Sequence, residues 1–212
     1  MFVFSDPDLI SATIEARKRG VRIQVMLNPA RRSGEEDNGE TRKQLEAAGI
    51  EVKDSNPAFI LTHEKSMVVD DEIAFIKSLN WATKNLTVTR DYAVTTNHKH
   101  EVDEVVAGFV ADWDRAVFDP GEHARMIWCK GNGRDRIARF IDEAKHSLFI
   151  QNERFQDLVI IERIVRAATH AAFHCPGFVH KCTVTQINKY TCVRLSFFLR
   201  SAARCISQKG HS

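Results

Sequence analysis

The polar side chains with the clearest chemical potential flank one short stretch of the chain. His63 and Lys65 are two residues apart, and so are Ser78 and Asn80 further along. The residues between these pairs are largely apolar and are interrupted by an acidic turn, which predicts two short buried strands joined as a hairpin. Because alternate side chains of a strand share a face, the four polar groups would gather at one end of that hairpin. An imidazole can act as nucleophile or acid/base, and the other three groups can donate to phosphate oxygens, so the set suits phosphate chemistry.

The spacing of these residues resembles the signature of the phospholipase D superfamily, which is written His-x-Lys-x4-Asp-x6-Gly-Ser-x-Asn. Five of its six fixed positions are matched at the correct spacing, by His63, Lys65, Asp70, Ser78 and Asn80. Lys77 stands where the superfamily has glycine. The alternative is a chance match in which His63 and Lys65 flank a strand on a solvated edge. Five matches in register are far more specific than a lone His-x-Lys pair, so the resemblance is favoured.

The resemblance implies a mechanism. His63 would attack phosphorus and form a phosphohistidine, which water or an alcohol then resolves, while Lys65, Ser78 and Asn80 would bind the non-bridging oxygens. Asp70 would join His63 and Lys65 in the catalytic set, mainly as a brace for the hairpin. No metal and no other cofactor is implied. In the superfamily the general acid is the histidine of a second motif, which this chain lacks; some single-motif members instead form homodimers that pair two motifs.

Length and composition restrict the class of protein. The chain has 212 residues and a formal net charge of +2, which is typical of a soluble globular protein with one domain, or one and part of a second. No apolar run approaches the roughly 18 residues needed to cross a bilayer, and residues 1–6 lack the features of a signal peptide. We therefore expect a cytoplasmic location or, at most, peripheral contact with a membrane. No basic stripe with interleaved aromatic residues is present, which argues against a nucleic-acid partner.

The elements around the hairpin follow from apolar periodicity. A strand over 2–4, a helix that starts at Ser5-Asp6-Pro7-Asp8 and a strand over 21–27 form a β-α-β unit, which favours a parallel sheet. The remaining expected elements are a helix over 37–48, strands over 50–52, 67–69, 73–76 and 91–96, and an amphipathic helix over 101–118 with Trp113 in its core face. The expected fold class is α/β: a phospholipase D-like repeat with a mixed, mostly parallel sheet flanked by helices, followed by an incomplete second repeat.

Other polar residues near the expected strand ends could take part in the site. Asn28 directly follows the strand over 21–27, at the edge where open α/β sheets bind ligands. Arg31 and Arg32, in the same loop, could pair with phosphate or simply lie in solvent, and the two interpretations are evenly supported. Asp91 could hold an imidazole by a hydrogen bond, or it could be an acid at a strand edge, which is somewhat better supported.

The chain is expected to divide at Asp119-Pro120-Gly121, where the helical pattern stops. We assign residues 1–120 to a phospholipase D-like repeat and residues 121–168 to the opening of a second repeat. A helix over 134–145, a strand over 147–152 and a helix over 155–168 support the second assignment, because their order repeats the opening of the chain. Residues 169–212 form a basic, Cys-containing tail of unrelated character, since all 28 acidic residues lie at or before Glu162.

The tail admits several interpretations. A zinc site is conceivable, but the paired Cys-x2-Cys spacing is missing from the available ligands, which are Cys175, Cys182, Cys192, Cys205, His170, His174 and His180. Disulfides are disfavoured because nothing indicates export. We favour a disordered or poorly folded extension. The weak periodicity and the missing second motif indicate a fragment whose tail comes from another reading frame.

Two functions remain open from the sequence. The first is a phosphodiesterase or phosphatidyltransferase that acts on phospholipid phosphodiesters, because residues 62–81 and 151–157 resemble the bacterial phospholipase D and cardiolipin synthase branch. A nuclease-like homodimer is a weaker variant of it. The second is a catalytically inactive fragment that lacks the second motif. Lys77 adds a further question, because its side chain could either crowd the hairpin or contact phosphate.

Overall fold

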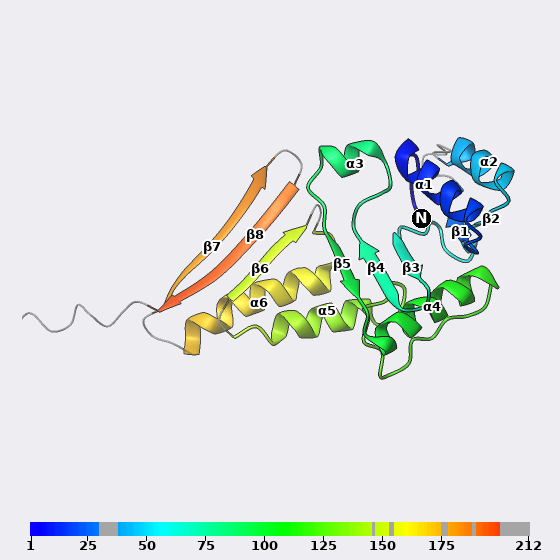
Figure 1. Cartoon of the computed structure of the whole chain (residues 1–212). Coiled ribbons are helices and arrows are strands. Elements are labelled where there is room, and N and C mark those ends of the chain that lie inside the picture. The colour runs from blue at the N-terminus through cyan, green and yellow to red at the C-terminus, as the bar shows by residue number, and fades with distance from the viewer. Residues whose placement is uncertain (30–37, 146, 153–154, 175–177, 188–189, 200–212) are drawn as a thin grey trace, which may run out of the picture. The chain divides into compact units, whose positions relative to one another are not determined.

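The computed structural model of the chain describes residues 1–29, 38–145, 147–152, 155–174, 178–187 and 190–199, and from residue 169 onward it describes the backbone alone. The chain forms two compact units, Met1–Met126 and Ile127–Ser212 (Figure 1). The predicted division after residue 120, and the assignment of the following segment to a second repeat, remain predictions.

The unit Met1–Met126 opens with alternating helices and strands. In chain order they are α1 (Pro7–Lys18), β1 (Gln24–Leu27), α2 (Gly39–Ala47) and β2 (Glu51–Asp54). α1 begins where the sequence predicts, because the Asp6 carboxylate accepts a hydrogen bond from the Leu9 amide at 3.1 Å and Pro7 follows the cap. β1 and β2 pair in parallel, with Val25 opposite Val52. The buried core of this part consists of Phe4, Ile10, Leu27, Leu45 and Ile50.

The predicted hairpin is confirmed. β3 (Ser66–Val69) and β4 (Ile73–Lys77) are antiparallel, and β5 (Ala93–Thr96) pairs antiparallel with β4. In the connecting turn Asp70 and Asp71 both have a φ of 54°, and the Glu72 amide donates to the Val69 carbonyl at 3.0 Å. Positive φ at both central residues is the pattern of a type I′ turn, whose twist matches that of the strands. α3 (Thr83–Thr87) and α4 (Lys99–Trp113) complete the unit.

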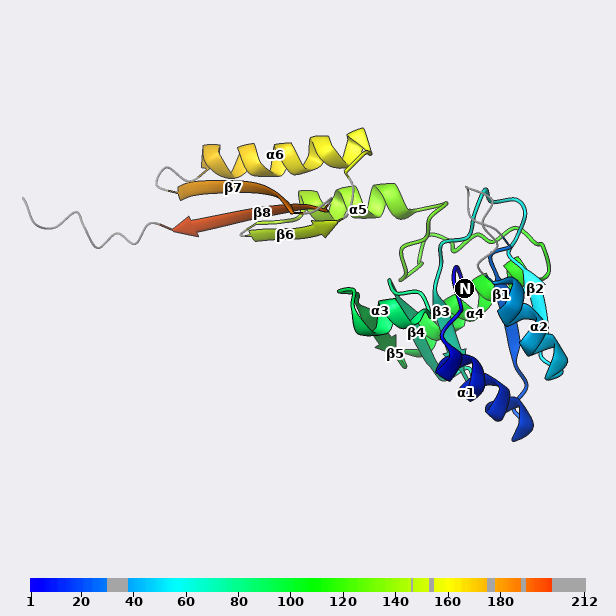
Figure 2. The same ribbon diagram turned by 90° about the horizontal axis from the view of Figure 1, so that it is seen from above.

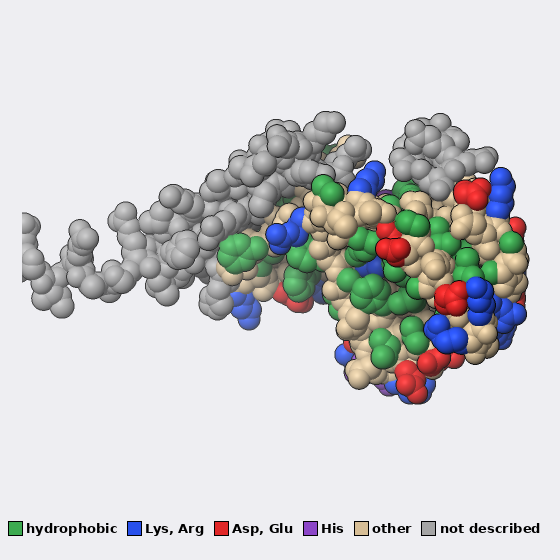
Figure 3. All heavy atoms as spheres, turned by 45° about the horizontal axis from the view of Figure 1, so that its top comes forward, with side chains coloured by type: hydrophobic (Ala, Val, Ile, Leu, Met, Phe, Trp, Pro, Cys, Tyr) green, Lys and Arg blue, Asp and Glu red, His purple; other side chains and the backbone are tan. Residues whose placement is uncertain are grey.

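The two faces of the hairpin differ in burial. One face packs on α4 (Figure 2), and the buried side chains between them are Ala74, Val102 and Val105. The other face carries Met67, Val69 and Ile73, which are 37%, 44% and 46% exposed. The strands predicted as buried are therefore half-buried, because an antiparallel hairpin needs only one covered face. Figure 3 shows apolar side chains exposed among charged ones on one side of this unit.

The helix predicted over 101–118 is shorter at its end. α4 stops at Trp113, and Arg115 has a φ of 61°, which no α-helix can continue. Val117 therefore leaves the predicted apolar face and is 96% exposed. Trp113 is buried as expected, and the Lys53 ammonium lies 4.5 Å from the centre of its ring.

In the unit Ile127–Ser212 the described residues form two helices and three strands. In chain order they are α5 (Gly133–Asp142), β6 (Ser147–Asn152), α6 (Leu158–His174), β7 (Phe178–Ile187) and β8 (Tyr190–Leu199). The core between α5, β6 and α6 consists of Ile141, Leu148 and Ile164. The strand order is β6-β8-β7, and both pairings are antiparallel. β6 and β7 therefore run in the same direction with β8 between them.

The antiparallel pair of β7 and β8 corrects the expectation of a disordered tail. Residues 178–187 and 190–199 are rich in Val, Thr, Phe, Tyr and Ile, which favour strands even without a regular apolar period. The loss of acidic residues after Glu162 does not oppose strand formation. Cys175 and Cys205 lie outside the described residues, as do Arg31 and Arg32. Within the described part of the chain, no group of three or more possible metal ligands comes together.

Residues 1–5 connect β1 to the end of the hairpin through backbone hydrogen bonds. The Asn28 amide donates to the Met1 carbonyl at 3.0 Å, the Trp81 amide donates to the Val3 carbonyl at 3.0 Å, and the Ser5 amide donates to the Trp81 carbonyl at 2.7 Å. Phe4 and Trp81 form a parallel bridge. The expectation of one mostly parallel sheet is wrong, because the described strands form separate sheets. β1–β2 is parallel, whereas β3, β4 and β5 are antiparallel, since the short β3–β4 turn permits only an antiparallel pairing.

Across the described residues, none of the helices combines the length and the apolar composition that crossing a membrane requires.

Candidate functional site

The hairpin register brings two lysines to the same end of the sheet. Ser66 pairs with Ile76, and one step further out the Lys77 amide donates to the Lys65 carbonyl at 3.1 Å. Residues directly opposite each other on antiparallel strands point to the same face. Both lysine side chains therefore lie on one face at the open end of the hairpin, next to the positions of His63 and Ser78.

His63 and Lys65 are in direct contact. The Lys65 ammonium lies 3.0 Å from His63 Nδ1 and donates to the His63 carbonyl at 2.6 Å. The ring of Phe2 covers both groups, since its centre is 4.5 Å from the imidazole centre and 5.1 Å from Lys65 Nζ. His63 is exposed, whereas Lys65 is 3% exposed. Burial lowers the pKa of Lys65 to about 8, although the nearby carboxylates of Asp91 and Glu64 act in the opposite direction.

Ser78 is oriented by Asp91, a contact that sequence reasoning did not find. The Ser78 hydroxyl donates to Asp91 Oδ1 at 2.8 Å, and Thr89 and Asn85 donate to the other carboxylate oxygen at 2.6 and 3.4 Å. Burial would raise the pKa of Asp91, but these hydrogen bonds and the Lys65 charge outweigh it and hold the pKa below its usual value. Asp91 is thus a carboxylate at neutral pH, and the hydroxyl it orients belongs to the motif.

Three buried polar atoms at this end of the hairpin have no hydrogen-bond partner among the described residues. They are Thr62 Oγ1, Lys77 Nζ and Asn80 Oδ1. Buried polar atoms are usually paired, so three orphans within one short region need an explanation. Lys77 is the most unusual of them, because it is 7% exposed and its ammonium lies 4.5 Å from the centre of the Trp81 ring.

Asn28 holds the backbone that leads into His63. Its Oδ1 accepts from the Thr62 amide at 3.1 Å and from the Ser55 hydroxyl at 3.4 Å, and its carbonyl accepts from Asn38 at 2.8 Å. Asn28 is 4% exposed. The Asn28 side chain therefore positions the segment before the hairpin. The sequence had suggested instead that Asn28 could contact a ligand.

Asp70 lies at the other end of the hairpin from the polar cluster. It is an exposed residue of the turn after β3, in the positive-φ conformation that Asp tolerates better than most residues. Asp70 is five positions after Lys65 along an extended strand, a span of roughly 16 Å. Of the five motif residues, His63 and Lys65 touch at the open end, and Ser78 and Asn80 follow β4 at that end, whereas Asp70 lies in the turn at the opposite end.

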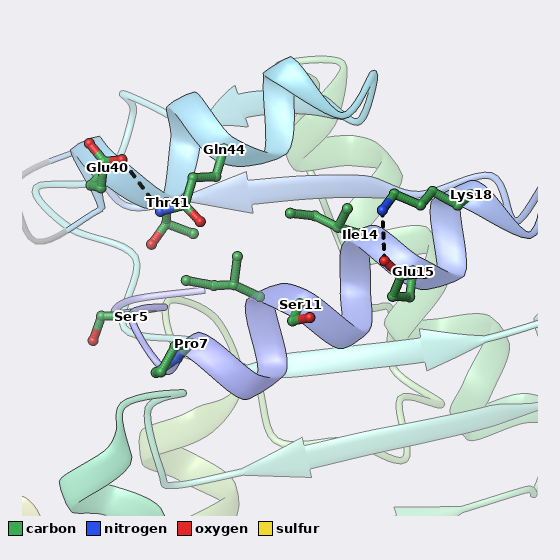
Figure 4. Close-up of a pocket in the computed structure, with 10 residues that line it drawn as sticks. Ser5, Pro7, Ser11, Ile14, Glu15, Lys18, Glu40, Thr41 and Gln44 are labelled. Atoms are coloured by element: carbon green, nitrogen blue, oxygen red, sulfur yellow. Dashed lines mark hydrogen bonds and ion pairs between the residues drawn. The ribbon is translucent and has the colours of Figure 1, made fainter.

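A pocket of 440 Å³ lies elsewhere, between α1 and α2 (Figure 4). It is lined by residues such as Ser11, Ile14 and Gln44, and by the exposed Lys18–Glu15 ion pair. It contains none of the motif residues, so it does not belong to the site.

A hairpin that joins His63 and Lys65 to Ser78 and Asn80 defines a phospholipase D-like domain. In agreement, the family model described as "Cardiolipin synthase, PLD-like domain" matches residues 1–113. This is more than half of the chain, and the chain belongs to this family.

Individual relatives are similar over part of their length. The human mitochondrial cardiolipin hydrolase is 32% identical over 136 residues, which are 63% of this chain and 50% of that protein. The chain thus spans about half the length of the curated relatives it matches. A polyphosphate kinase from Porphyromonas gingivalis has a similar fold, with a TM-score of 0.56 and 20% identity over 79% of this chain and 30% of that one. Nuc from Salmonella typhimurium, a phospholipase D family member, has a TM-score of 0.49 and 20% identity over 55% of this chain and 76% of that one.

Proposed function

We propose that the chain is a phospholipase D-like phosphodiesterase that uses His63 as nucleophile on a phospholipid phosphodiester. The observation that carries the proposal is the 3.0 Å contact between His63 Nδ1 and Lys65 Nζ at the open end of the hairpin. An imidazole beside an ammonium can attack phosphorus while the ammonium binds the phosphate oxygens. Similarity to a cardiolipin hydrolase supports a lipid substrate. Transfer to an alcohol in place of water is the finer alternative for the second step.

The reaction has two balanced steps. In the first, a ring nitrogen of His63 forms a bond to phosphorus, and the bond from phosphorus to the leaving oxygen breaks as that oxygen takes a proton from a general acid. In the second, water attacks phosphorus, the phosphorus–nitrogen bond breaks, and the water proton passes back to the same group. Lys65, Ser78 and Asn80 bind the non-bridging oxygens, and Asp91 keeps the Ser78 hydroxyl oriented.

The contact between Lys65 and His63 also controls which ring nitrogen can react. An ammonium only donates, so Nδ1 accepts and a neutral ring carries its proton on Nε2. When a phosphate oxygen takes the Lys65 hydrogen bond in its place, the lone pair on Nδ1 is released. Phosphate binding and activation of the nucleophile are thereby coupled through one ammonium.

A single copy of the motif provides the nucleophile but no second histidine for the leaving group, because the chain has no further His-x-Lys. We propose a homodimer in which His63 of a second copy is the general acid. This arrangement makes activity depend on association, so activity per subunit should fall on dilution below the dissociation constant of the dimer.

The proposal is tested by trapping the covalent intermediate. The chain is mixed with vesicles that contain ³²P-labelled cardiolipin, quenched in alkaline detergent, and digested for mass spectrometry. We expect an acid-labile label on His63 that is absent from His63→Ala. His100→Ala is the matched control, because His100 is an exposed histidine on α4 outside the site. Sedimentation velocity on the same samples measures the dimer.

Each outcome of this experiment decides between the alternatives. A label on His63 together with a dimer supports the enzyme. No label from any phosphodiester, in a chain that stays monomeric, supports the inactive fragment. A label from a ³²P-labelled oligonucleotide but not from cardiolipin would retain the phosphodiesterase and reject the lipid substrate.

A further inference from the structure

Lys77 occupies a position where a glycine would leave open space in the site. Its backbone amide is bonded to the Lys65 carbonyl at 3.1 Å, so its side chain emerges on the same face as the phosphate-binding Lys65. The long side chain therefore adds a second ammonium to the polar end of the hairpin.

The surroundings of Lys77 leave its charge uncompensated by hydrogen bonds. The ammonium lies 4.5 Å from the ring centre of Trp81 and 5.2 Å from that of Phe75. Among the described residues it has no hydrogen-bond acceptor, while the charges that act on it are the carboxylate of Glu64 and the ammonium of Lys65. Contacts with aromatic faces offset only part of the cost of burying an ammonium. The remainder is an unpaired buried cation.

The chemistry that would satisfy this cation is an anion with several acceptor oxygens. Thr62 Oγ1 is also buried without a partner, and a hydroxyl can donate to the same anion. A lysine stem has four rotatable bonds, so the ammonium can turn from its aromatic wall toward a group bound beside Lys65. Two ammoniums on one face match a phosphate that carries two negative charges better than one that carries a single charge.

We propose that Lys77 is a second phosphate-binding ammonium, which together with Lys65 holds one phosphate group at the open end of the hairpin. The inference rests on the proposed function for the location of the phosphate, but it concerns binding and not turnover. It implies that the site distinguishes phosphate groups by their charge. A dianionic phosphate, or the more negative state reached during attack on a diester, gains more from Lys77 than a resting diester does.

The test is calorimetric titration of the full chain at pH 7.5 with inorganic phosphate, which is mainly dianionic, and with dimethyl phosphate, which is monoanionic. Lys77→Met removes the charge at nearly constant length, and Lys77→Gly introduces the residue that the superfamily signature has at this position. Lys43→Met is the matched control, since the Lys43 side chain is 78% exposed on α2.

We expect Lys77→Met and Lys77→Gly to weaken the binding of inorganic phosphate about tenfold or more, the size of one charge-assisted hydrogen bond. The loss of affinity should be smaller for dimethyl phosphate, and Lys43→Met should leave the binding of both compounds unchanged. Unchanged or tighter phosphate binding in both variants, or no binding by the wild-type chain, overturns the inference. A label on His63 with Lys77-independent phosphate binding rejects the inference alone. Lys77-dependent phosphate binding without a label on His63 rejects the proposed function alone.

Discussion

Replacing Lys77 with methionine is expected to change how the free energy of unfolding depends on pH. Burial holds the pKa of Lys77 at about 8 in the folded chain, against an ordinary 10.5. Below pH 8 the ammonium is protonated in both states, so the folded state carries the full cost of the buried charge. Between pH 8 and 10.5 the unfolded chain binds more protons, and the free energy of unfolding therefore rises with pH. Methionine does not titrate, so the variant lacks the part of this increase in the free energy of unfolding that comes from Lys77.

The magnitude follows from the same two pKa values. The difference between the pKa of Lys77 in the unfolded and folded chain corresponds to roughly 3 kcal/mol at full burial. Charges in proteins interact through a higher effective dielectric than that of a dry interior, and this screening reduces the expectation to about 1 to 2 kcal/mol. Lys77 suits the experiment because its ammonium donates no hydrogen bond among the described residues, so methionine leaves no acceptor unpaired there.

The assay is urea unfolding at pH 7, 8, 9 and 10, followed by circular dichroism in phosphate-free buffer. Differences in shape and apolar contact between lysine and methionine do not depend on pH, so they offset the two stability curves by a constant and do not affect how their separation changes with pH. The stability advantage of Lys77→Met over wild type should shrink by about 1 to 2 kcal/mol between pH 8 and 10. Parallel curves would show that the ammonium is not buried, and they would remove the physical basis for its assignment as an unpaired cation.

Three other variants test the positioning of the site and the core. Asn28→Ala should lower the free energy of unfolding by about 1 to 3 kcal/mol and speed hydrogen exchange at the Thr62 amide, which loses its acceptor; unchanged exchange there would contradict the anchoring role. Leu45→Ala, at a side chain with 0% exposure, should cost about 2 to 5 kcal/mol in urea unfolding, and a loss typical of surface sites would refute its place in the core. Asp91→Ala should slow phosphohistidine formation about tenfold, because Ser78 loses the acceptor that orients its hydroxyl, whereas Asp91→Asn should retain most of the rate; equal rates for Asp91→Ala and wild type would exclude this role.

The parts of the structure that sequence reasoning predicted are those controlled by nearby residues. The start of α1 at Asp6 and the β3–β4 hairpin depend on capping and turn chemistry within a few positions, so both were accessible from the sequence. The hairpin of β7 and β8 was missed because its strands have high strand propensity without a clear alternation, and because composition was taken as a sign of disorder.

The finer organisation of the site depends on residues that are distant in the chain. Asn28 reaches Thr62 across more than thirty positions, and its role as an anchor could not be distinguished from a ligand contact without the tertiary structure. The bond from Ser78 to Asp91 arises because β4 and β5 are neighbours. The motif spacing predicts the candidate reacting groups, but the groups that contact them emerged only from the packing of separate elements.

The strand order β6-β8-β7 has a consequence for the order of events during folding. β8 is the last described strand in the sequence, yet it is the middle strand of its sheet and the hydrogen-bonded neighbour of both β6 and β7. Among the described strands β6 therefore has no partner on either edge until β8 has been synthesised, and an open edge is where strands of other molecules can add. In Met1–Met126, by contrast, β3 and β4 can pair as soon as their short turn has formed. The unit with the motif can thus complete its local pairing early, while β6 and β7 in the other unit wait for β8 to join them.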